Sequence, residues 1–382
     1  MRIVIVGGGI GGLTLALALG REGFEPEVYE QAPELLEVGA GIAVWPNAFK
    51  VLERLGLGEP VLARAGRIEE ARWLGSEGRL YNTFRFPPTG APAAALRRAD
   101  LQSALVGALP EGRLRLGKTF LKYEEEGGGV RAFFDGGSEV VCDLLVGADG
   151  LHSRVRARLH GGEGPPVYRG YNVWRGVARL EHASLLEGTA LEVYGRGRRF
   201  GVGPLGLGRT GWWATANEPE GTPESPAEHA QKLSRLFDGW PPPVPELIAA
   251  TPSEHILRNA AYDRTAAGAW ARGRAALLGD AVHPMTPNLG QGGCQAIEDA
   301  AVLARCLAKY ADAARSLPAY ETLRCRRAER VARYSRLYGA VGQLESRAAS
   351  ALRARLLSSV PEAFGRRLLS LVFDYDAYAV EV

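Results

Sequence analysis

The chain opens with an alternation of apolar and polar segments that predicts a strand, a helix and a second strand. The β-branched run "RIVIV" at 2–6 predicts a short strand, and "LTLALALGREG" at 13–23 has the apolar spacing of a helix. "EPEVYEQ" at 25–31 predicts the second strand. A unit of this type, completed within about 30 residues, is typical of a β-α-β crossover with parallel strands.

The middle of the chain follows a different pattern. "RIEEARWLGSEGRLYNTFRF" at 67–86 alternates on both sides of a "GSEG" turn and predicts a hairpin. Residues 98–109 have a helical pattern, and 113–149 contains short strands separated by glycines. The stretch 163–272 is rich in Trp, Tyr, Gly and Pro and is expected to be mostly β, whereas the pattern from 292 onward is helical.

Together these patterns predict an α/β fold with an inserted sheet. One Rossmann-like cofactor domain is expected from 1–66, 97–162 and 273–345. A mostly antiparallel β-sheet substrate domain is expected from 67–96 and 163–272, and 346–382 is expected to form a C-terminal helical tail. Apolar residues of that tail could dock a partner or a second subunit, or could pack on the chain itself. The protein is expected to be a monomer or a homodimer. A length of 382 residues favours more than one core.

Composition narrows the class of partner. The chain is 46% hydrophobic and 23% charged with a net charge of +3, which gives no strong case for nucleic acid or a membrane surface as the partner. No run reaches the roughly 18 apolar residues that a membrane-spanning helix needs. Its four cysteines are far apart, without a C-x-x-C pair or a histidine at metal spacing. We therefore expect a reduced, cytoplasmic protein without a metal site.

The first candidate ligand site is the glycine turn after the first strand. Gly7, Gly9 and Gly12 form G-x-G-x-x-G. These glycines allow a tight turn, a close approach of backbone to pyrophosphate, and close packing of helix on strand. Glu30 ends the second strand, where a ribose hydroxyl needs an acceptor. This spacing predicts an adenine dinucleotide.

Two further strands end in an acid and a glycine. "LLVGADGLHSRVR" at 144–156 carries Asp149 and Gly150, followed by arginines that could contact phosphate or form a solvated helix face. "LLGDAVHPMTPNLGQGGCQAIEDA" at 277–300 carries Asp280, which could accept from a ribityl hydroxyl. Its glycines would let a flat ring lie against the backbone, and the helix that follows would stabilise negative charge on that ring. These glycines are Gly290, Gly292 and Gly293. FAD is the ligand that these sites predict together.

The three motifs, in this order and spacing, resemble those of the group A FAD-dependent monooxygenases, the p-hydroxybenzoate hydroxylase-like family. The resemblance extends over about residues 1–340 and includes "VGAGIAVWPNAFKVLERLGL" at 38–57 and "LRRADLQSAL" at 96–105. It implies FAD contacts from further residues: Gln31, Ala43, Val44, Arg98, Gln102, Phe120, Asp149, Gly150, Gln291 and Cys294. The alternative for Arg98 is a charge at the N-terminus of a helix, and the alternative for Cys294 is a small packed side chain.

The resemblance also implies an activity. FAD would be reduced by NADH or NADPH as co-substrate, without a separate nicotinamide domain. O₂ would then form a flavin hydroperoxide that transfers one oxygen atom to a planar aromatic or heteroaromatic substrate. Within the family the chain is nearest the urate and salicylate hydroxylase branch. The basic residue that urate hydroxylases carry falls on Arg199, but "RTGWWATA" at 209–216 lacks their aromatic hydroxyl, which argues against urate.

Few residues are candidates for catalysis. His283 could act in catalysis or could shape the loop with Pro284, which is expected to set the loop facing the ring edge. Arg199 is expected to bind or activate an anionic substrate. The expected substrate pocket consists of Tyr194, Arg199, Trp212 and Trp213, with packing of the sheet as the alternative for the aromatic residues. Glu298 and Asp299 are expected to be first-turn helix charges.

Three alternatives stay within flavoenzymes: an epoxidase, a monooxygenase of polyketides or tetracyclines, and a dehydrogenase that uses no oxygen. A fourth belongs to another class, a flavin-binding sensor without turnover. In each enzymatic alternative the partner is a small aromatic or polycyclic molecule.

Overall fold

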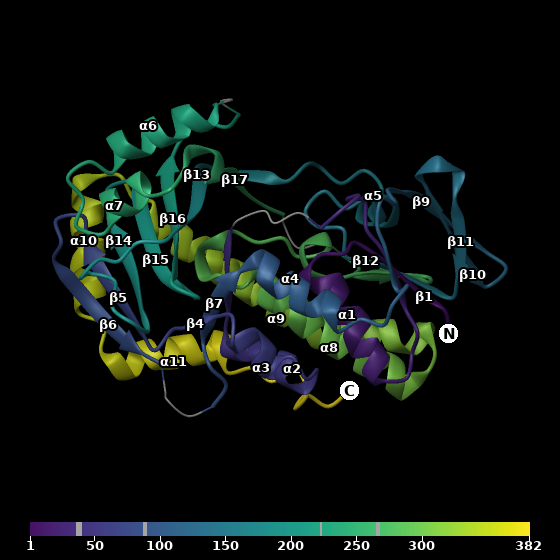
Figure 1. Cartoon of the computed structure of the whole chain (residues 1–382). Coiled ribbons are helices and arrows are strands. Elements are labelled where there is room, and N and C mark those ends of the chain that lie inside the picture. The colour runs from purple at the N-terminus through teal and green to yellow at the C-terminus, as the bar shows by residue number, and fades with distance from the viewer. Residues whose placement is uncertain (36–39, 87–89, 222–223, 265–267) are drawn as a thin grey trace.

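The computed structural model describes residues 1–382 except 36–39, 87–89, 222–223 and 265–267. Two large sheets lie at opposite ends of the molecule, with the long helices of the C-terminal half between them (Figure 1). This arrangement of a nucleotide-type sheet, a largely antiparallel sheet and a C-terminal helical region confirms the predicted fold class. The predicted domain boundaries stay predictions.

The six-stranded sheet forms because its central strands are apolar on both faces. Its order is β18-β19-β12-β1-β2-β8, and all neighbours are parallel except β18–β19. The strands are β1 (Ile3–Val6), β2 (Glu27–Tyr29), β8 (Leu114–Arg115), β12 (Leu144–Gly147), β18 (Ala271–Arg272) and β19 (Ala275–Leu277). All four residues of β1 are buried, as in parallel sheets covered by helices.

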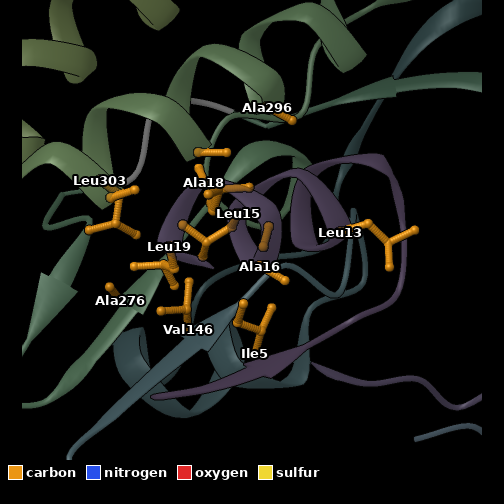
Figure 2. Close-up of a cluster of buried hydrophobic side chains, with 14 of the residues drawn as sticks. Ile5, Leu13, Leu15, Ala16, Ala18, Leu19, Val146, Ala276, Ala296 and Leu303 are labelled. Atoms are coloured by element: carbon orange, nitrogen blue, oxygen red, sulfur yellow. The ribbon is translucent and has the colours of Figure 1, made fainter. Parts of the chain in front are cut away.

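Helix α1 (Ile10–Arg21) packs between this sheet and helix α8 (Gly292–Tyr310). Figure 2 shows Leu15 and Leu19 of α1 beside Val146 of β12 and Leu303 of α8. Helices α2 (Pro46–Arg54), α3 (Gly58–Leu62), α4 (Arg98–Gly107) and α5 (Arg154–His160) complete this region.

Two three-stranded sheets flank the large one. The first has the order β11-β10-β9, with β9 (Phe120–Glu126), β10 (Gly129–Phe134) and β11 (Glu139–Cys142). The second has the order β3-β7-β4, with β3 (Gly41–Val44), β4 (Gly66–Arg67) and β7 (Ala94–Arg97). The second sheet borders β15 of the large antiparallel sheet, so it joins the two halves of the molecule.

The seven-stranded sheet has the order β17-β13-β16-β15-β14-β5-β6, and only β14–β5 is a parallel pair. The strands are β5 (Glu70–Gly75), β6 (Leu80–Arg85), β13 (Val167–Ala178), β14 (Thr189–Tyr194), β15 (Arg198–Gly206), β16 (Arg209–Asn217) and β17 (Leu257–Asp263). Helices α6 (Pro226–Leu236) and α7 (Val244–Ala249) cover one face through a core that includes Trp174 and Phe200. The predicted hairpin over 67–86 is present as β5 and β6.

The C-terminal helices connect the two large sheets. In α9 (Ala313–Gly342), Tyr320 donates a hydrogen bond to the Leu277 carbonyl of the six-stranded sheet. Toward the other end of α9, Tyr338 donates to Glu192 of the seven-stranded sheet over 2.6 Å. Helices α10 (Arg347–Ser358) and α11 (Glu362–Phe373) then pack against the edge strand β6.

The last residues return to the first region, where Arg305 donates to the carbonyls of Ala377 and Val380. The tail therefore packs on its own chain, although Leu352 and Leu356 stay exposed. Among the described residues, no helix is long and apolar enough to cross a membrane.

Candidate cofactor and substrate site

The glycine turn between β1 and α1 brings three backbone segments into contact. Gly7 has φ +113°, and a Cβ there would lie 2.4 Å from the carbonyl oxygen of Ala148. A Cβ on Gly12 would lie 2.0 Å from the carbonyl oxygen of Gly7. Only glycine fits either position, because backbone atoms cannot rotate away as a side chain can.

The space beside this turn is open, and a cation borders it. A Cβ on Gly9 would meet only the Arg98 guanidinium, at 4.0 Å. Gly9 is also the N-cap of α1, and no side chain caps the first N–H groups of that helix. An uncapped helix N-terminus next to a cation suits a pyrophosphate. At this end the residues fit an adenine dinucleotide.

Glu30 is fixed at the end of β2 beside the same turn. Its carboxylate accepts hydrogen bonds from the Gly8 N–H (2.6 Å) and from the Ala32 N–H (2.9 Å). Gln102 of α4 donates to the Gly8 carbonyl over 2.8 Å. The carboxylate therefore has a fixed position next to the turn, where it could accept from a ribose hydroxyl.

Asp149 caps the following helix. It accepts from the Ser153 hydroxyl at 2.5 Å and from the backbone N–H of Arg154 at 2.8 Å. The nearby arginines are engaged by protein groups. Arg154 donates to the Phe120 carbonyl, and buried Arg156 pairs with Glu163 and donates to the Val282 carbonyl. Arg156 is therefore neither a solvated helix charge nor free for phosphate.

Asp280 is the acceptor at the other end of the site. Asp280 is exposed to solvent. In the part of the chain that the structure describes, its carboxylate accepts no hydrogen bond. Its Oδ1 lies 3.6 Å from where a Cβ on Gly292 would be, at the start of α8. Surrounding protein desolvates this carboxyl and raises its pKa, although His283 and Arg98 oppose the rise. An acid in this setting fits a ligand that brings hydroxyl donors, as the ribityl chain of FAD would.

The segment around β3 lies against the glycine loop before α8. Gly290 has φ +60°, and a Cβ there would lie 3.6 Å from the Ala43 side chain and 3.0 Å from Trp45 Nε1. Cys294 lies 3.5 Å from the Ala43 carbonyl, and burial raises the pKa of its thiol to about 12. The structure thus brings Ala43, Gly290 and Cys294 together, with Cys294 as an unreactive packed thiol.

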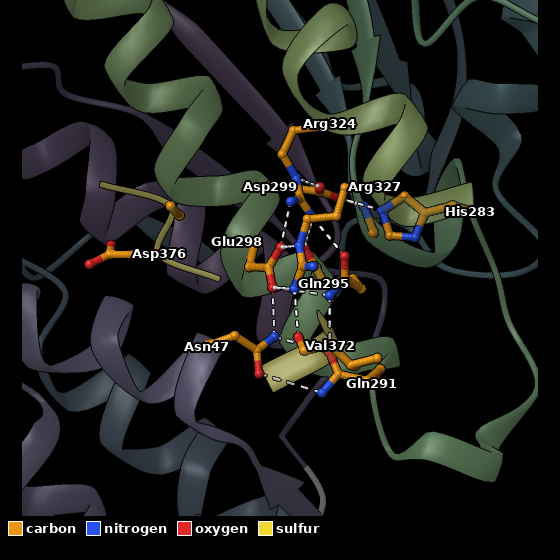
Figure 3. Close-up of polar contacts among 12 residues, drawn as sticks. Asn47, His283, Gln291, Gln295, Glu298, Asp299, Arg324, Arg327, Val372 and Asp376 are labelled. Carbon is orange, nitrogen blue, oxygen red and sulfur yellow. Dashed lines mark hydrogen bonds and ion pairs between the residues drawn. The ribbon is translucent and has the colours of Figure 1, made fainter. Parts of the chain in front are cut away.

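His283 lies behind this loop in a buried polar cluster (Figure 3). It is 5% exposed, and its Nε2 lies 2.5 Å from Asp299 Oδ2. Burial alone would raise the pKa of Asp299, but the charges of His283 and Arg324 lower it to about 2. This placement suits the loop-shaping alternative for His283; a catalytic role stays a prediction.

The interpretation of Glu298 and Asp299 as first-turn helix charges is wrong. Both are fully buried, beyond the first turn of α8. Glu298 accepts from Asn47 at 2.6 Å and from Arg327 at 2.7 Å, and it pairs with Arg324. The cationic partners Arg324 and Arg327 come from α9, and no feature of the sequence near residue 298 predicts them.

Two neighbouring tryptophans of β16 leave the sheet on opposite faces. Trp212 points to the helix-covered face, where its Nε1 donates to Thr251 over 2.9 Å and its ring stacks on Phe200. Trp213 points to the other face, with its ring over Gly201. The packing alternative therefore fits Trp212, while only Trp213 is on the face toward the glycine loop.

Arg199 lies on that second face and is fully buried. Its guanidinium donates to Glu192 at 3.0 Å, to Gln343 at 3.1 Å and to Asn288 of the loop before α8. Sequence reasoning missed Tyr171, whose hydroxyl accepts from the same Asn288 at 2.9 Å. Arg199 is thus anchored beside the loop, and its contact with substrate stays a prediction.

Tyr194 is on the same face, where its hydroxyl contacts that of Tyr338. Burial raises its pKa well above the ordinary value, so the phenol stays protonated.

In the part of the chain that the structure describes, no cluster of His, Cys, Asp and Glu could hold a metal ion.

Known proteins are similar to this chain in sequence and in fold. A family described as FAD binding domain matches residues 1–335. An aurachin C monooxygenase/isomerase of Stigmatella aurantiaca is 42% identical over 361 residues, covering 94% of each chain. An FAD-dependent urate hydroxylase of Klebsiella pneumoniae is 35% identical over 332 residues, covering 86% of each. The structure of Klebsiella pneumoniae HpxO with FAD and uric acid has a TM-score of 0.92 at 32% identity, covering 98% of this chain and 96% of that one.

Proposed function

The chain belongs to the family of FAD-dependent monooxygenases, and on this premise we propose that it hydroxylates a planar aromatic or heteroaromatic molecule held between the loop 284–290 and the seven-stranded sheet. FAD as cofactor and NAD(P)H as co-substrate are those of the family. Membership of a family of enzymes argues against the alternative of a flavin-binding sensor without turnover. When bound and reduced by NAD(P)H, FAD supplies the activation of O₂ from which one oxygen atom is transferred.

The residues of the chain would bind and orient the reactants. The glycine turn and the N-terminus of α1 would hold the pyrophosphate, with Glu30 on the adenosine ribose and Asp280 on the ribityl chain. The N-terminus of α8 would lie near the flavin ring, where its partial positive charge stabilises negative charge on the ring. The sheet would hold the substrate and exclude water from it.

One observation carries the substrate proposal: the sheet face toward the loop is open beside an aromatic ring. On β15, a Cβ on Gly203 would meet no heavy atom within 4 Å. Trp213 lies across from Gly201, two residues before Gly203 on the same face. A flat ring could therefore lie against the backbone there, with an indole at its side.

The test is to oxidise NADH and NADPH with the FAD-loaded protein in the presence of urate, small aromatic acids, quinoline derivatives and polyketides. O₂ uptake and hydrogen peroxide are recorded together. We expect one ring compound to accelerate NAD(P)H oxidation without an equal yield of peroxide, and to appear as a product heavier by one oxygen atom. If every ligand that accelerates the oxidation gives stoichiometric peroxide, the proposed substrate class is wrong.

We predict that Asp280→Asn weakens FAD binding by about tenfold to a hundredfold, because a charged acceptor is worth about 1.5–3 kcal/mol. The dissociation constant is measured by titrating the apoprotein with FAD and following flavin fluorescence. Since desolvation of the carboxyl by the surrounding protein raises the pKa of Asp280, the wild-type affinity should fall as the pH falls through that raised pKa. D280N should lose this dependence. The control, D238N, changes an exposed aspartate and should bind FAD like the wild type; equal affinities for D280N and D238N would contradict the assignment.

A further inference from the structure

Strand β13 presents a second arginine, Arg175, on the sheet face toward the loop. Side chains alternate along a strand, and Trp174 packs into the helix-covered core, so Arg175 leaves the sheet on the other side. Two residues on that side of β13, one before and one after Arg175, reach the cofactor region. Tyr171 bonds to Asn288, and Val177 packs on the same apolar cluster as Trp45, the residue that lies against Gly290. Arg175 is between them and faces the same loop.

The guanidinium of Arg175 has no anionic partner in the described part of the chain. Its Nη1 donates to the Asn259 side chain at 3.0 Å, and no carboxylate lies within ion-pair distance. Burial lowers its pKa. Arg199, on the same face, pairs with Glu192. A guanidinium carries five N–H donors in a planar fork suited to a carboxylate, so most of the donors of Arg175 are available.

The surroundings of Arg175 suit a planar ligand. Arg175 is opposite Trp213 in the strand register, and Trp213 is opposite Gly201. The open position at Gly203 is two residues farther along β15 on the same face. A ring placed over Gly203 would therefore have an indole and a guanidinium nearby.

We propose that Arg175 binds an anionic oxygen of the substrate, a carboxylate or a phenolate, while the ring of that substrate lies over Gly203 beside Trp213. This rests on the proposed function, which places the substrate on this face. Charge compensation is the physical reason: a desolvated guanidinium without an anion is costly, and an incoming anionic oxygen removes that cost. Arg175, rather than the fully paired Arg199, sets the preference for acids.

Binding titrations of the FAD-loaded protein test this without turnover. The probes are three acid–amide pairs: benzoate and benzamide, 2-naphthoate and 2-naphthamide, quinoline-4-carboxylate and its carboxamide. We expect at least one acid to bind the wild type more tightly than its amide. Arg175→Gln should weaken that acid by about tenfold to a hundredfold and change the amide by less than about twofold. Arg175→Lys should lie between. The control is R179Q, at an exposed arginine just after the same strand.

Either of two binding results overturns the proposal: no acid binds the wild type more tightly than its amide, or R175Q binds the acid as the wild type does. If R175Q instead raises the KM for NADPH and not for NADH, the bound anion is the nucleotide phosphate, which also overturns it. FAD content and thermal unfolding equal to the wild type show that R175Q is folded. If an acid binds through Arg175 but no compound receives an oxygen atom, the proposed function is wrong while the role of Arg175 in binding the anion is supported.

Discussion

Replacing Arg324 with Met should destabilise the protein by about 3–5 kcal/mol, because it leaves two buried carboxylates without their shared cation. Arg324 is fully buried between Glu298 and Asp299, with its Nε 2.7 Å from Asp299. Arg327 would remain as the cationic partner of Glu298, and His283 would remain beside Asp299. Since Asn47 and Gln291 belong to the same cluster, FAD retention should fall as well. Denaturant unfolding followed by circular dichroism and flavin fluorescence measures both effects.

The matched control is Arg326→Met, two residues away on the same helix and exposed. It removes an equal charge from the surface and should change stability by less than about 0.5 kcal/mol. Unfolding of R324M and R326M at the same denaturant concentration would show that the buried cluster does not stabilise the fold.

Gly12→Ala should yield a protein that is purified with little FAD and is less stable by about 1–3 kcal/mol. The new methyl group would lie 2.0 Å from the Gly7 carbonyl oxygen, so β1 and α1 would have to separate. Their separation would move the N–H groups expected to hold pyrophosphate. The ratio of flavin absorbance to protein absorbance after purification reports the loss.

Gly20→Ala, in the same helix, is the control for this change. A Cβ on Gly20 would meet nothing within 4 Å, and alanine favours a helix interior by roughly 0.5–1 kcal/mol. G20A should therefore keep its FAD and match or exceed the wild-type stability. A G12A protein that retains stoichiometric FAD would contradict this prediction, because the turn would then accommodate a methyl group for which its geometry leaves no room.

The sequence supported predictions whose causes are local. The β1-α1-β2 unit follows from an apolar run, a glycine turn and a periodic helix, all within about 30 residues. The hairpin of β5 and β6 follows from period-two alternation around a glycine turn. The structure has these elements where the patterns place them.

Features that depend on distant segments could not be predicted in this way. Glu298 and Asp299 look like surface charges until α9 brings Arg324 against them. Adjacent Trp212 and Trp213 must point to opposite faces of a strand, but only the packing of α7 decides which one is covered. Whether Arg175 has an anionic partner depends in the same way on its neighbours in the sheet. These neighbours are β16 and β17, which are distant from β13 in the sequence.

The length of α9 constrains how the site can open. Tyr320 is anchored at the six-stranded sheet and Tyr338 at the seven-stranded sheet, a separation of 18 residues or about 27 Å along the helix axis. A continuous helix of this length is a strut, and its two fastened ends prevent the sheets from rotating apart. We therefore expect reactants to enter and products to leave by rearrangement of side chains and short connecting segments, without a change in the distance between the two large sheets.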